Sequence, residues 1–509
     1  MPRQTKTKTA SKPKDYAAKR SFDKTPEPSP EVPGDVDPGV ARPGETFVIH
    51  QHHATRLHYD LRLEMLNGKT PVLVSWAVPK NLPLVKGKMH LAVHVEDHPF
   101  DYGSFSGSIP AGNYGAGEVR IFDAGTYEVL EQEPGKLSFR LNGKRLHGVW
   151  HLFKTKDEDD KNWLVRLREW EGDPPEPLPD LKPMMATLKE EPFDDPKWIF
   201  EPKWDGVRAL AVCQHDETML LSRNSRDITK SYPELAKMHD RMVAIDAIVD
   251  GEIVALEGKR PSFERLQSRI NLHNERDIAK AMHDIPITFI AFDLLYLDGK
   301  SQIAKPIEER KALLSELVVQ SERVQVSPFL EESGTALFET ASEMRLEGIV
   351  GKKLGSTYRP GRRIKEWLKI KAIHSGDLVI GGWTPGEGSR SKSFGAVLIG
   401  AYEGADLRFV GSVGTGFSDA MLKAIYPRLE ELETDDCPFV DDPTNTRSSS
   451  FSKIIHNPRW VKPELVCRVE FRELTSAGRL RAPSFKGIRD DIDPKECTFE
   501  ALEVEAGLA

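Results

Sequence analysis

The chain has little of what marks secreted, membrane-spanning or disulfide-stabilised proteins. Its four cysteines lie far apart in 509 residues and form no C-x-x-C pair, so neither a disulfide framework nor a zinc site is predicted. The longest apolar run, residues 287–297, is shorter than a membrane span and carries an aspartate, and no apolar signal core follows Met1. We therefore expect a cytoplasmic protein with reduced cysteines and no membrane contact.

An excess of positive charge is also absent, because 71 Lys and Arg face 79 Asp and Glu for a formal net charge of −8. An acidic chain is not a uniform nucleic-acid coat, so any DNA surface must be local, in grooves and tails. The first twenty residues form one basic tail. We expect residues 1–46, which are basic and then rich in proline, to be disordered, either as a solvated segment or as a sliding contact with DNA phosphates.

The length is too great for one core and predicts a multidomain α+β protein. Short strands separated by glycines and charged turns predict a small β-barrel in residues 47–169, and the prolines of residues 170–183 predict a semi-rigid linker. Residues 184–372 have mixed α and β character, with helical apolar spacing at 233–242 and 308–318. Short strands return in residues 373–509, where we expect a C-terminal OB-fold barrel.

One lysine, Lys203, stands among groups suited to making it attack a phosphorus atom, in the segment EPKWDGVR of residues 201–208. A lysine amine attacks only after it has lost its proton, and a neighbouring cation such as Arg208 favours the neutral form. The pattern K-x-D-G-x-R alone is equally compatible with a surface turn. The later segments of the chain decide between these interpretations.

Three of those segments carry acids in an apolar setting. Asp250 and Glu252 share one face of an expected strand, because side chains alternate along a strand. Asp293 is embedded in the apolar run of residues 289–295, where a carboxylate needs either a partner or a function. Residues 347–352 repeat the acid-glycine-apolar pattern and end in a lysine.

A fourth segment, residues 367–371, places two lysines side by side. Alternation puts Trp367, Lys369 and Lys371 on one face and points Leu368 and Ile370 into a core. Adjacent ammonium groups repel each other unless an anion lies between them, and a triphosphate is the obvious candidate.

Taken in order, the motifs K-x-D-G-x-R, S-R-N (residues 222–224), D-G-E, F-D-x-L, E-G-x-V-x-K and W-x-K-x-K resemble the nucleotidyltransferase series of ATP-dependent DNA ligases. The resemblance implies that ATP, with Mg²⁺ or Mn²⁺, adenylates the lysine of the first motif, Lys203. It also implies that Arg208 and Arg223 contact AMP and the nick phosphate, that Glu252 contacts the ribose and that Phe292 contacts the adenine. Glu347 would bind the metal, and Lys369 and Lys371 would bind the α-phosphate.

Residues 481–491 resemble the closing motif of the same enzymes, which orients the pyrophosphate leaving group during lysine adenylation. That motif ordinarily continues to a lysine, and Ile492 stands in its place. We therefore expect Arg489 and Asp491 to carry this role alone.

A second group of chemistry-bearing residues comes earlier in the chain. Alternation along residues 57–64 puts His58, Asp60 and Arg62 on one face of a strand and apolar side chains on the other. With His52 and His98 they offer imidazoles and a carboxylate, which are ligands suited to a divalent transition metal. A solvent-exposed strand edge is the alternative interpretation.

The motifs around these residues, H-x(5)-H-Y-D-x-R-L-E, S-W-A-V-P-K, E-D-H-P-x-D-Y and I-P-A-G-N-Y-G-A-G, resemble the 3′-phosphoesterase domain of bacterial DNA ligase D over about residues 20–168. The resemblance implies that His52, His58 and Asp60 hold a Mn²⁺ or similar ion. It implies phosphate contacts from Arg62, His98 and Tyr102. It also marks Arg20 and Glu27 as further functional positions.

Three positions depart from that family's pattern: Ser21 replaces Asp, His50 replaces Gln and Ser106 replaces Glu. The metal triad survives these departures. They leave open whether the trimming of a 3′-ribonucleoside is retained alongside the removal of a 3′-phosphate.

The sequence therefore predicts a bacterial, nucleoid-associated enzyme that heals 3′ ends and seals DNA ends and nicks in non-homologous end joining. Proteins of the resembled family commonly add a primase-like polymerase and act with the end-bridging protein Ku. Because no third catalytic domain is evident, we expect Ku and a separate polymerase as partners. Two alternatives remain, an RNA ligase or capping-type nucleotidyltransferase, and a DNA-end-binding scaffold that has lost catalysis.

Overall fold

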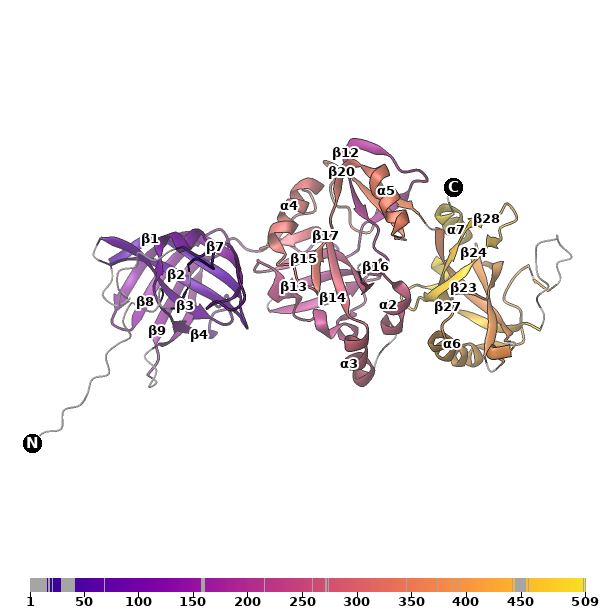
Figure 1. Cartoon of the computed structure of the whole chain (residues 1–509), viewed down its shortest axis with the longest axis horizontal. Helices are drawn as coiled ribbons and strands as arrows, with labels where there is room; N and C mark the ends of the chain where they lie inside the picture. The colour runs from indigo at the N-terminus through magenta and orange to yellow at the C-terminus, as the bar shows by residue number, and fades with distance from the viewer. Residues whose placement is uncertain are drawn as a thin grey trace, which may run out of the picture. The chain divides into compact units, whose positions relative to one another are not determined.

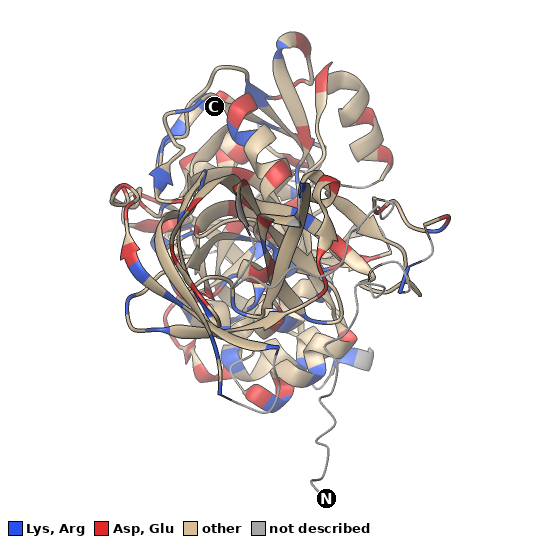
Figure 2. Ribbon diagram, turned by 90° about the vertical axis from the view of Figure 1, so that its left-hand side faces the viewer, with Lys and Arg blue, Asp and Glu red and all other residues tan. Residues whose placement is uncertain are grey.

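The computed structural model describes Tyr16, Lys19, Arg20, residues 22–28 and residues 42–508, apart from residues 68, 157–160, 215, 259, 271, 273, 345, 373, 387, 392, 442, 445–454, 456 and 507. The chain forms two compact units (Figure 1): unit 1 is residues 1–176 with 242–245, and unit 2 is residues 177–241 with 246–509. Acidic and basic residues are interspersed along the described chain (Figure 2). None of the helices in the described part is long and apolar enough to cross a membrane.

Unit 1 is built on a closed antiparallel barrel of eight strands (Figure 1). The barrel closes because β1 pairs with both β2 and β7, so that no strand of the ring is left as a free edge. In ring order the strands are β1 (Arg42–His53), β2 (Leu57–Asn67), β3 (Thr70–Val78), β4 (Met89–His94), β10 (Asn162–Trp170), β9 (His147–Lys154), β8 (Lys136–Gly143) and β7 (Gly117–Glu133). The expected small β-barrel is confirmed.

Two short strands and one turn of helix complete this unit. They are β5 (His98–Pro99), which pairs with β3, β6 (Gly107–Ile109), which pairs with β7, and the 3-10 helix η1 (Phe100–Ser104). Large side chains such as Trp76, Trp150, Phe122 and Phe139 are fully buried. Their burial removes a large apolar area from water and stabilises the barrel.

Part of the lead-in segment packs on the barrel, which corrects the expectation that residues 1–46 are disordered. Tyr16 is 1% exposed and packs with Val48, Leu73 and Tyr102. Burial of this aromatic ring supplies the apolar contact that the composition of the segment did not suggest. The basic residues 3–14 of the expected tail lie outside the described residues.

Two sheets make up the first part of unit 2. One has the order β11 (Met185–Leu188), β22 (Arg363–Lys371), β21 (Gly348–Lys353), β12 (Asp194–Pro202) and β20 (Leu330–Ser333). The other has the order β14 (Glu217–Ser222), β13 (Val207–Gln214), β15 (Ala247–Glu257), β17 (Ile287–Leu297) and β18 (Lys300–Ser301), with β16 (Arg260–Pro261) on β15 and β19 (Val324–Val326) on β17. The motif residues lie on these strands or directly beside their ends.

Four α-helices accompany these sheets: α2 (Phe263–Ile270), α3 (Glu275–Asp284), α4 (Ile307–Leu317) and α5 (Gly334–Glu343). Helix α4 confirms the helical spacing at 308–318. The helix expected at 233–242 is wrong, since the chain there forms the short 3-10 turns η2 (Thr229–Ser231), η3 (Pro233–Leu235) and η4 (Met238–Arg241). Tyr232, Leu235 and Met238 are all buried and lie three residues apart, which is the repeat of a 3-10 helix.

The last part of unit 2 is a third sheet, of order β25 (Asp406–Val413), β24 (Phe394–Glu403), β23 (His374–Pro385), β27 (Arg459–Phe471) and β26 (Glu433–Thr434), with β30 (Ser484–Ile488) on β27. Beside it are the pair β28 (Glu473–Leu474) and β29 (Leu480–Arg481), the turns η5 (Gly388–Arg390) and η6 (Pro494–Glu496), and two α-helices, α6 (Asp419–Glu431) and α7 (Phe499–Glu505). Thr498 caps α7 by accepting a hydrogen bond from the backbone N–H of Ala501 at 3.1 Å.

Candidate active sites

Unit 2 contains a cavity of about 320 Å³ that gathers every site residue expected in that part of the chain. Its lining combines strands β12, β13, β15, β17, β21 and β22 with the third sheet and α7. The nine expected residues in the lining are Lys203, Arg208, Arg223, Glu252, Phe292, Glu347, Lys369, Lys371 and Arg489. Residues almost three hundred positions apart in sequence thus face one space.

Lys203 follows β12, and its backbone N–H donates to the carbonyl of Gly348 at 2.9 Å. Its side chain forms an ion pair with Glu347, the residue just before β21. Burial alone would raise the pKa of Glu347, but Lys203 and Lys371 outweigh it and hold the pKa well below its usual value. Lys203 is therefore held against an anion, which was not foreseen.

The cation expected beside Lys203 is engaged elsewhere. Arg208 donates from Nε and Nη2 to the two carboxylate oxygens of Asp250, at 2.6 Å each, and Tyr358 donates its hydroxyl to the same carboxylate at 2.6 Å. Asp250 therefore balances the charge through which Arg208 was expected to favour the neutral lysine amine. Arg208 instead lies over the ring of Phe292, with its guanidinium carbon 4.4 Å from the ring centroid.

Glu252 and Asp205 are carboxyls with raised pKa values in this cavity. Burial raises the pKa of Glu252 to about 7, although Arg208 and Lys203 oppose the shift. Burial and the charge of Glu347 raise the pKa of Asp205. Perturbed carboxyls of this kind concentrate at functional sites, because burial there is combined with interacting charges.

Lys369 and Lys371 lie side by side on β22, as expected, and Trp367 lines the same cavity. Ile370 is fully buried, whereas Leu368 is only half-buried. The anion between the two ammonium groups is Glu505 on α7, which forms an ion pair with each of them. Nothing in the sequence marked this glutamate.

Arg489 follows β30 and is 6% exposed. Its Nε and Nη2 donate to the carboxylate of Asp491 at 2.8 Å each. Ile492, which stands where a lysine is usual, packs against the apolar cluster that includes Phe439 and Cys497. Two further charged residues, Asp377 and Arg468, line the cavity beside them and were missed because neither belongs to a recognised motif.

Asp293, the carboxylate in the apolar run, has a partner. Arg310 on α4 donates to it from Nε and Nη2 at 2.7 and 2.9 Å, and both side chains are fully buried. Of the two alternatives for Asp293, pairing is therefore the correct one.

In unit 1, β1 and β2 bring together the three expected metal ligands. His52 lies opposite His58 in the strand register, and Asp60 is two residues further along β2. One ligand atom from each residue lies within 4.8 Å of the others. The distances are 3.8 Å from His52 Nδ1 to Asp60 Oδ2 and 3.6 Å from His58 Nε2 to Asp60 Oδ1.

The hydrogen bonds of the two histidines fit a metal centre. His52 donates from Nε2 to the carbonyl of Gly115 at 2.8 Å, and His58 donates from Nδ1 to the carbonyl of Arg56 at 3.0 Å. A carbonyl can only accept, so each ring carries its proton on the nitrogen turned away from Asp60. The remaining nitrogens keep free lone pairs beside the carboxylate, which is the arrangement that outer partners impose on metal-binding imidazoles.

Burial and charge favour the ligating forms of these groups. Burial is the main cause that lowers the pKa of His52, so its imidazole is neutral. Burial alone would raise the pKa of Asp60, but Arg62 and His58 outweigh it and lower the pKa. A neutral imidazole and an ionised carboxylate are the states that bind a metal ion.

Arg62, His98 and Tyr102 lie next to the triad. Arg62 donates from Nη2 to Asp60 at 2.9 Å and from Nη1 to Ser75 at 2.8 Å, and its guanidinium lies 4.8 Å from the centroid of the Tyr102 ring. The rings of His98 and Tyr102 are 4.8 Å apart. Burial and nearby arginines lower the pKa of His98 well below its usual value.

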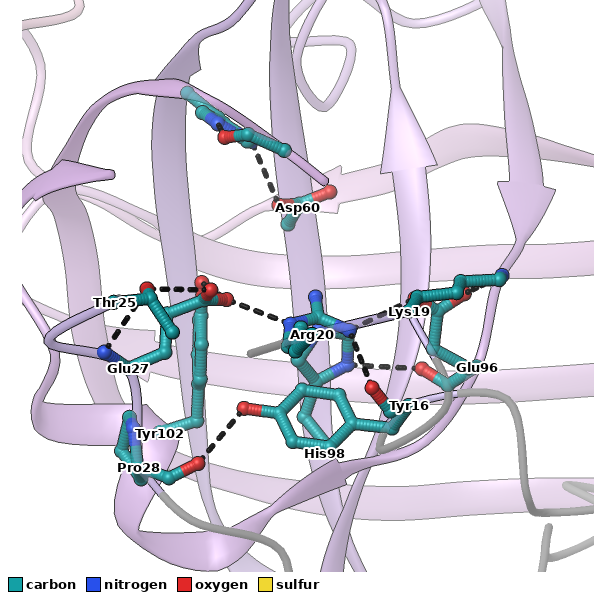
Figure 3. Close-up of polar contacts among 12 residues, drawn as sticks. Tyr16, Lys19, Arg20, Thr25, Glu27, Pro28, Asp60, Glu96, His98 and Tyr102 are labelled. Atoms are coloured by element: carbon teal, nitrogen blue, oxygen red, sulfur yellow. Dashed lines mark hydrogen bonds and ion pairs between the residues drawn. The ribbon is translucent and has the colours of Figure 1, made fainter. Parts of the chain in front are cut away.

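Residues of the lead-in segment, Tyr16, Arg20 and Glu27, lie beside His98 and Tyr102 (Figure 3). Arg20 lies between Glu27 and Glu96, at 2.8 Å from the first carboxylate and 3.4 Å from the second. Tyr102 donates its hydroxyl to Glu27 at 3.3 Å. The two lead-in positions suggested by the resemblance, Arg20 and Glu27, therefore lie at the same site as the other residues.

Two of the three departures from the family pattern, His50 and Ser106, are accommodated without disturbing the triad. His50 accepts a hydrogen bond from Nε of Arg62 at 3.2 Å through its Nδ1, and Ser106 donates to the carbonyl of Val119 at 3.3 Å. Ser21 lies outside the described residues.

Three protein families match this chain. The DNA ligase D 3′-phosphoesterase domain matches residues 50–154, the ATP dependent DNA ligase domain matches residues 183–371, and the ATP dependent DNA ligase C terminal region matches residues 390–492. The first match lies in unit 1 and the other two lie in unit 2.

Relatives match almost the whole chain. The multifunctional non-homologous end joining protein LigD of Mycolicibacterium smegmatis is 38% identical over 501 residues, and that of Pseudomonas aeruginosa is 34% identical over 542 residues. These matches cover 95% and 96% of this chain, and the chain spans 61% of each relative. A structure of mycobacterial DNA ligase D complexed with ATP and MES is 32% identical, with a TM-score of 0.48 over 63% of this chain and 98% of its own. The domain matches and these relatives together identify the chain as a member of the DNA ligase D family, with a 3′-phosphoesterase domain followed by an ATP-dependent DNA ligase domain.

Proposed function

We propose that unit 2 is an ATP-dependent DNA ligase that works through a lysyl-AMP intermediate. It would consist of a mixed α/β nucleotidyltransferase domain, residues 184–372, and an OB-fold domain, residues 373–509. The observation that carries this proposal is the single cavity lined by all nine expected residues, with Lys203 among them. A surface turn around Lys203 would have no reason to gather these groups.

The first step is the adenylation of Lys203. Its amine attacks the α-phosphorus of ATP, and pyrophosphate leaves. Lys369 and Lys371 bind the α-phosphate, because paired ammonium groups stabilise the negative charge that develops there. Phe292 provides a flat apolar surface for the adenine, and Glu252 accepts from the ribose hydroxyls.

The AMP then passes to the 5′-phosphate of a DNA nick, and the 3′-hydroxyl attacks the activated phosphate and expels AMP. Arg208 and Arg223 line the cavity and bind the phosphates in these steps. Guanidinium groups suit this role because their planar donors match phosphate oxygens in pairs.

Glu347 would hold the divalent cation of the ligase. Its pKa is held low, so it is ionised, and it lines the cavity beside Lys203. Mg²⁺ is commonly bound by one or two carboxylates together with substrate phosphates, and a single glutamate fits that pattern. When bound, the cation would neutralise phosphate charge.

For unit 1 we propose a metal-dependent 3′-phosphoesterase. His52, His58 and Asp60 would hold a Mn²⁺ or similar ion, and the free lone pairs beside Asp60 support this assignment. When bound, the ion would polarise the phosphate ester. Arg62 would donate hydrogen bonds to the phosphate oxygens, and Tyr102 would do so once its hydroxyl turns away from Glu27; His98 lies beside the Tyr102 ring and would serve the same phosphate.

The two activities belong to one repair task. A 3′-phosphate blocks ligation because no hydroxyl remains to attack the adenylated 5′ end. The names of the relatives place them in non-homologous end joining, and we extend this role to the present chain. DNA ends and nicks would be its substrates, with Ku and a polymerase as partners.

The test uses one nicked duplex that ends in either a 3′-hydroxyl or a 3′-phosphate, incubated with labelled ATP and with Mg²⁺ or Mn²⁺. We expect sealing of the first duplex, and sealing of the second only after its phosphate has been removed. The same nick built in RNA distinguishes an RNA ligase. A protein that captures no label and seals neither duplex would instead be an end-binding scaffold.

A further inference from the structure

An arginine from outside the recognised motifs lies in the ligase cavity. Arg468 is on β27, directly opposite Asp377 of β23 in the strand register, and its side chain is 19% exposed. Its Nε and Nη2 donate to the two carboxylate oxygens of Asp377 at 3.1 and 3.2 Å. The remaining Nη1 is 3.5 Å from Oδ1 of Asp205, which leaves at most a long hydrogen bond.

Arg489 is anchored in the same way. Its Nε and Nη2 hold Asp491, while its Nη1 is buried without a hydrogen-bond partner and lies 3.9 Å from Oδ1 of Asp377. Both guanidinium groups lie near the ring of Phe263, at 5.4 and 5.7 Å from its centroid. Each arginine thus uses Nε and Nη2 on a carboxylate. The Nη1 of Arg468 has only the long contact with Asp205, and the Nη1 of Arg489 has no hydrogen-bond partner.

An anchored pair of this kind is suited to a polyanion. A carboxylate that holds Nε and Nη2 fixes the orientation of the guanidinium before a ligand arrives. A buried donor without a partner is costly, so it marks a place where a ligand supplies the acceptor. A diphosphate offers several acceptor oxygens to two such donors at once.

The position of Arg468 near Lys203 indicates which phosphates of ATP Arg468 would contact. Its Nη1 is 3.5 Å from Asp205, two residues after Lys203, and it lines the same cavity as Lys203 and Glu347. Position 492 supplies no cation, because Ile492 packs against apolar side chains. Arg468 therefore brings a positive charge close to the nucleophile from a different strand.

We propose that Arg468, together with Arg489, binds the β- and γ-phosphates of ATP and stabilises pyrophosphate as it leaves during the adenylation of Lys203. This inference rests on the proposed ligase function. In that step the neutral Nζ of Lys203 forms a bond to the α-phosphorus, and the bond from that phosphorus to the bridging oxygen breaks. The electron pair leaves with pyrophosphate, and Nζ gives up one proton to water. Positive charge at the leaving group accelerates this step because negative charge accumulates there.

The experiment separates the step that releases pyrophosphate from the step that does not involve it. Arg468→Gln is compared with the wild-type chain in three assays: adenylation by labelled ATP, discharge of the adenylated protein by added pyrophosphate, and sealing of a nick that already carries a 5′-adenylate. We expect kcat/KM for adenylation to fall by roughly 10- to 100-fold, less than the roughly 100- to 1,000-fold cost of removing a lone charge-stabilising donor, because Arg489 keeps its charge. The pyrophosphate concentration for half-maximal discharge should rise, and sealing of the adenylated nick should stay within about twofold.

Two further variants separate the loss of the Arg468 charge at the phosphates from a general effect on the fold. Arg468→Gln removes the bidentate partner of the half-buried Asp377 and leaves it only the 3.9 Å contact with Arg489, so the double variant with Asp377→Asn removes both charges and keeps the shape. Arg459→Gln changes an exposed arginine on the same strand, whose side chain is 60% exposed, and should behave as wild type.

Equal loss in all three assays, in the single and the double variant, would overturn the proposal and make Arg468 a structural contact between β27 and the loop after Lys203. Unchanged adenylation and discharge would overturn it as well. A wild-type chain that captures no AMP would instead refute the ligase function, and this result is read before any variant is compared.

Discussion

Replacing Glu505 with glutamine should make ATP bind more tightly. Glu505 forms ion pairs with Lys369 and Lys371, so its carboxylate and the α-phosphate of ATP compete for the same two ammonium groups. Burial alone would raise the pKa of Glu505, but Lys371 and Lys369 outweigh it and lower the pKa to about 2. The carboxylate is therefore charged throughout the pH range of a ligation assay, and ATP must displace it.

The size of the effect follows from the burial of the three side chains, which are between 4% and 23% exposed. An exposed ion pair is worth roughly 0–1 kcal/mol, and the pairs of Glu505 are neither fully exposed nor fully dry. Glutamine keeps a hydrogen-bond acceptor, so we assign about 0.5–1 kcal/mol to each lost pair. The sum of about 1–2 kcal/mol corresponds to a KM for ATP that is lower by roughly 5- to 30-fold.

The assay is the rate of AMP capture as a function of ATP concentration, with Glu500→Gln as the control. Glu500 is an exposed glutamate on the same helix, so this variant removes one acid from α7 without touching the two lysines. A KM for Glu505→Gln that is unchanged or higher would refute the reasoning, since it would mean that Glu505 aligns the lysines for ATP rather than competing with it.

Four other outcomes are expected. Lys203→Ala should abolish AMP capture and sealing and leave 3′-phosphate removal intact; loss of both activities would mean that the units share one site. His58→Ala should abolish metal-dependent 3′-phosphatase activity and spare the sealing of a 3′-hydroxyl nick, whereas wild-type hydrolysis would make the cluster structural. Burial raises the pKa of Glu252 from 4.5 to about 7, so ionising this carboxyl lowers the stability of the fold progressively as the pH rises between those values. Glu252→Gln should therefore stabilise the protein by about 1–3 kcal/mol at pH 8 and not at pH 4, as measured by thermal unfolding. Asp293→Ala should destabilise the protein by about 3–5 kcal/mol in denaturant unfolding, because it leaves the fully buried Arg310 without its counter-charge; a loss below 1 kcal/mol would contradict this.

The sequence was most informative where chemistry depends on strand alternation. His58, Asp60 and Arg62 were expected on one face of a strand, and the structure joins Asp60 to both of the others and to His52. Period-two alternation is a property of the backbone, so it could be predicted without knowing what packs against the strand. The same reasoning placed Lys369 and Lys371 on one face of β22.

Partners in space could not be predicted in the same way. The sequence offers Arg208 as a neighbour of Lys203, but the strand pairing of β13 with β15 engages Arg208 with Asp250 and leaves Lys203 to Glu347. The helix expected at 233–242 failed for a related reason. A repeat of three buried residues fits a 3-10 turn as well as one face of an α-helix, and only the surrounding contacts decide between them.

These pairings give the ligase cavity a property that no single motif predicts, namely that six of its cations have carboxylate partners. The pairs are Lys203 with Glu347, Arg208 with Asp250, Lys369 and Lys371 with Glu505, Arg468 with Asp377, and Arg489 with Asp491. A cluster of buried cations without counter-charges would cost several kcal/mol for each ion, and the carboxylates offset that cost. ATP binding then exchanges one set of anions for another. Asp250 on β15 and Asp377 on β23 belong to sheets and hold their arginines in place, whereas Glu505 belongs to helix α7 and pairs with the two lysines proposed to bind the α-phosphate. We therefore expect Glu505 to leave when the triphosphate arrives.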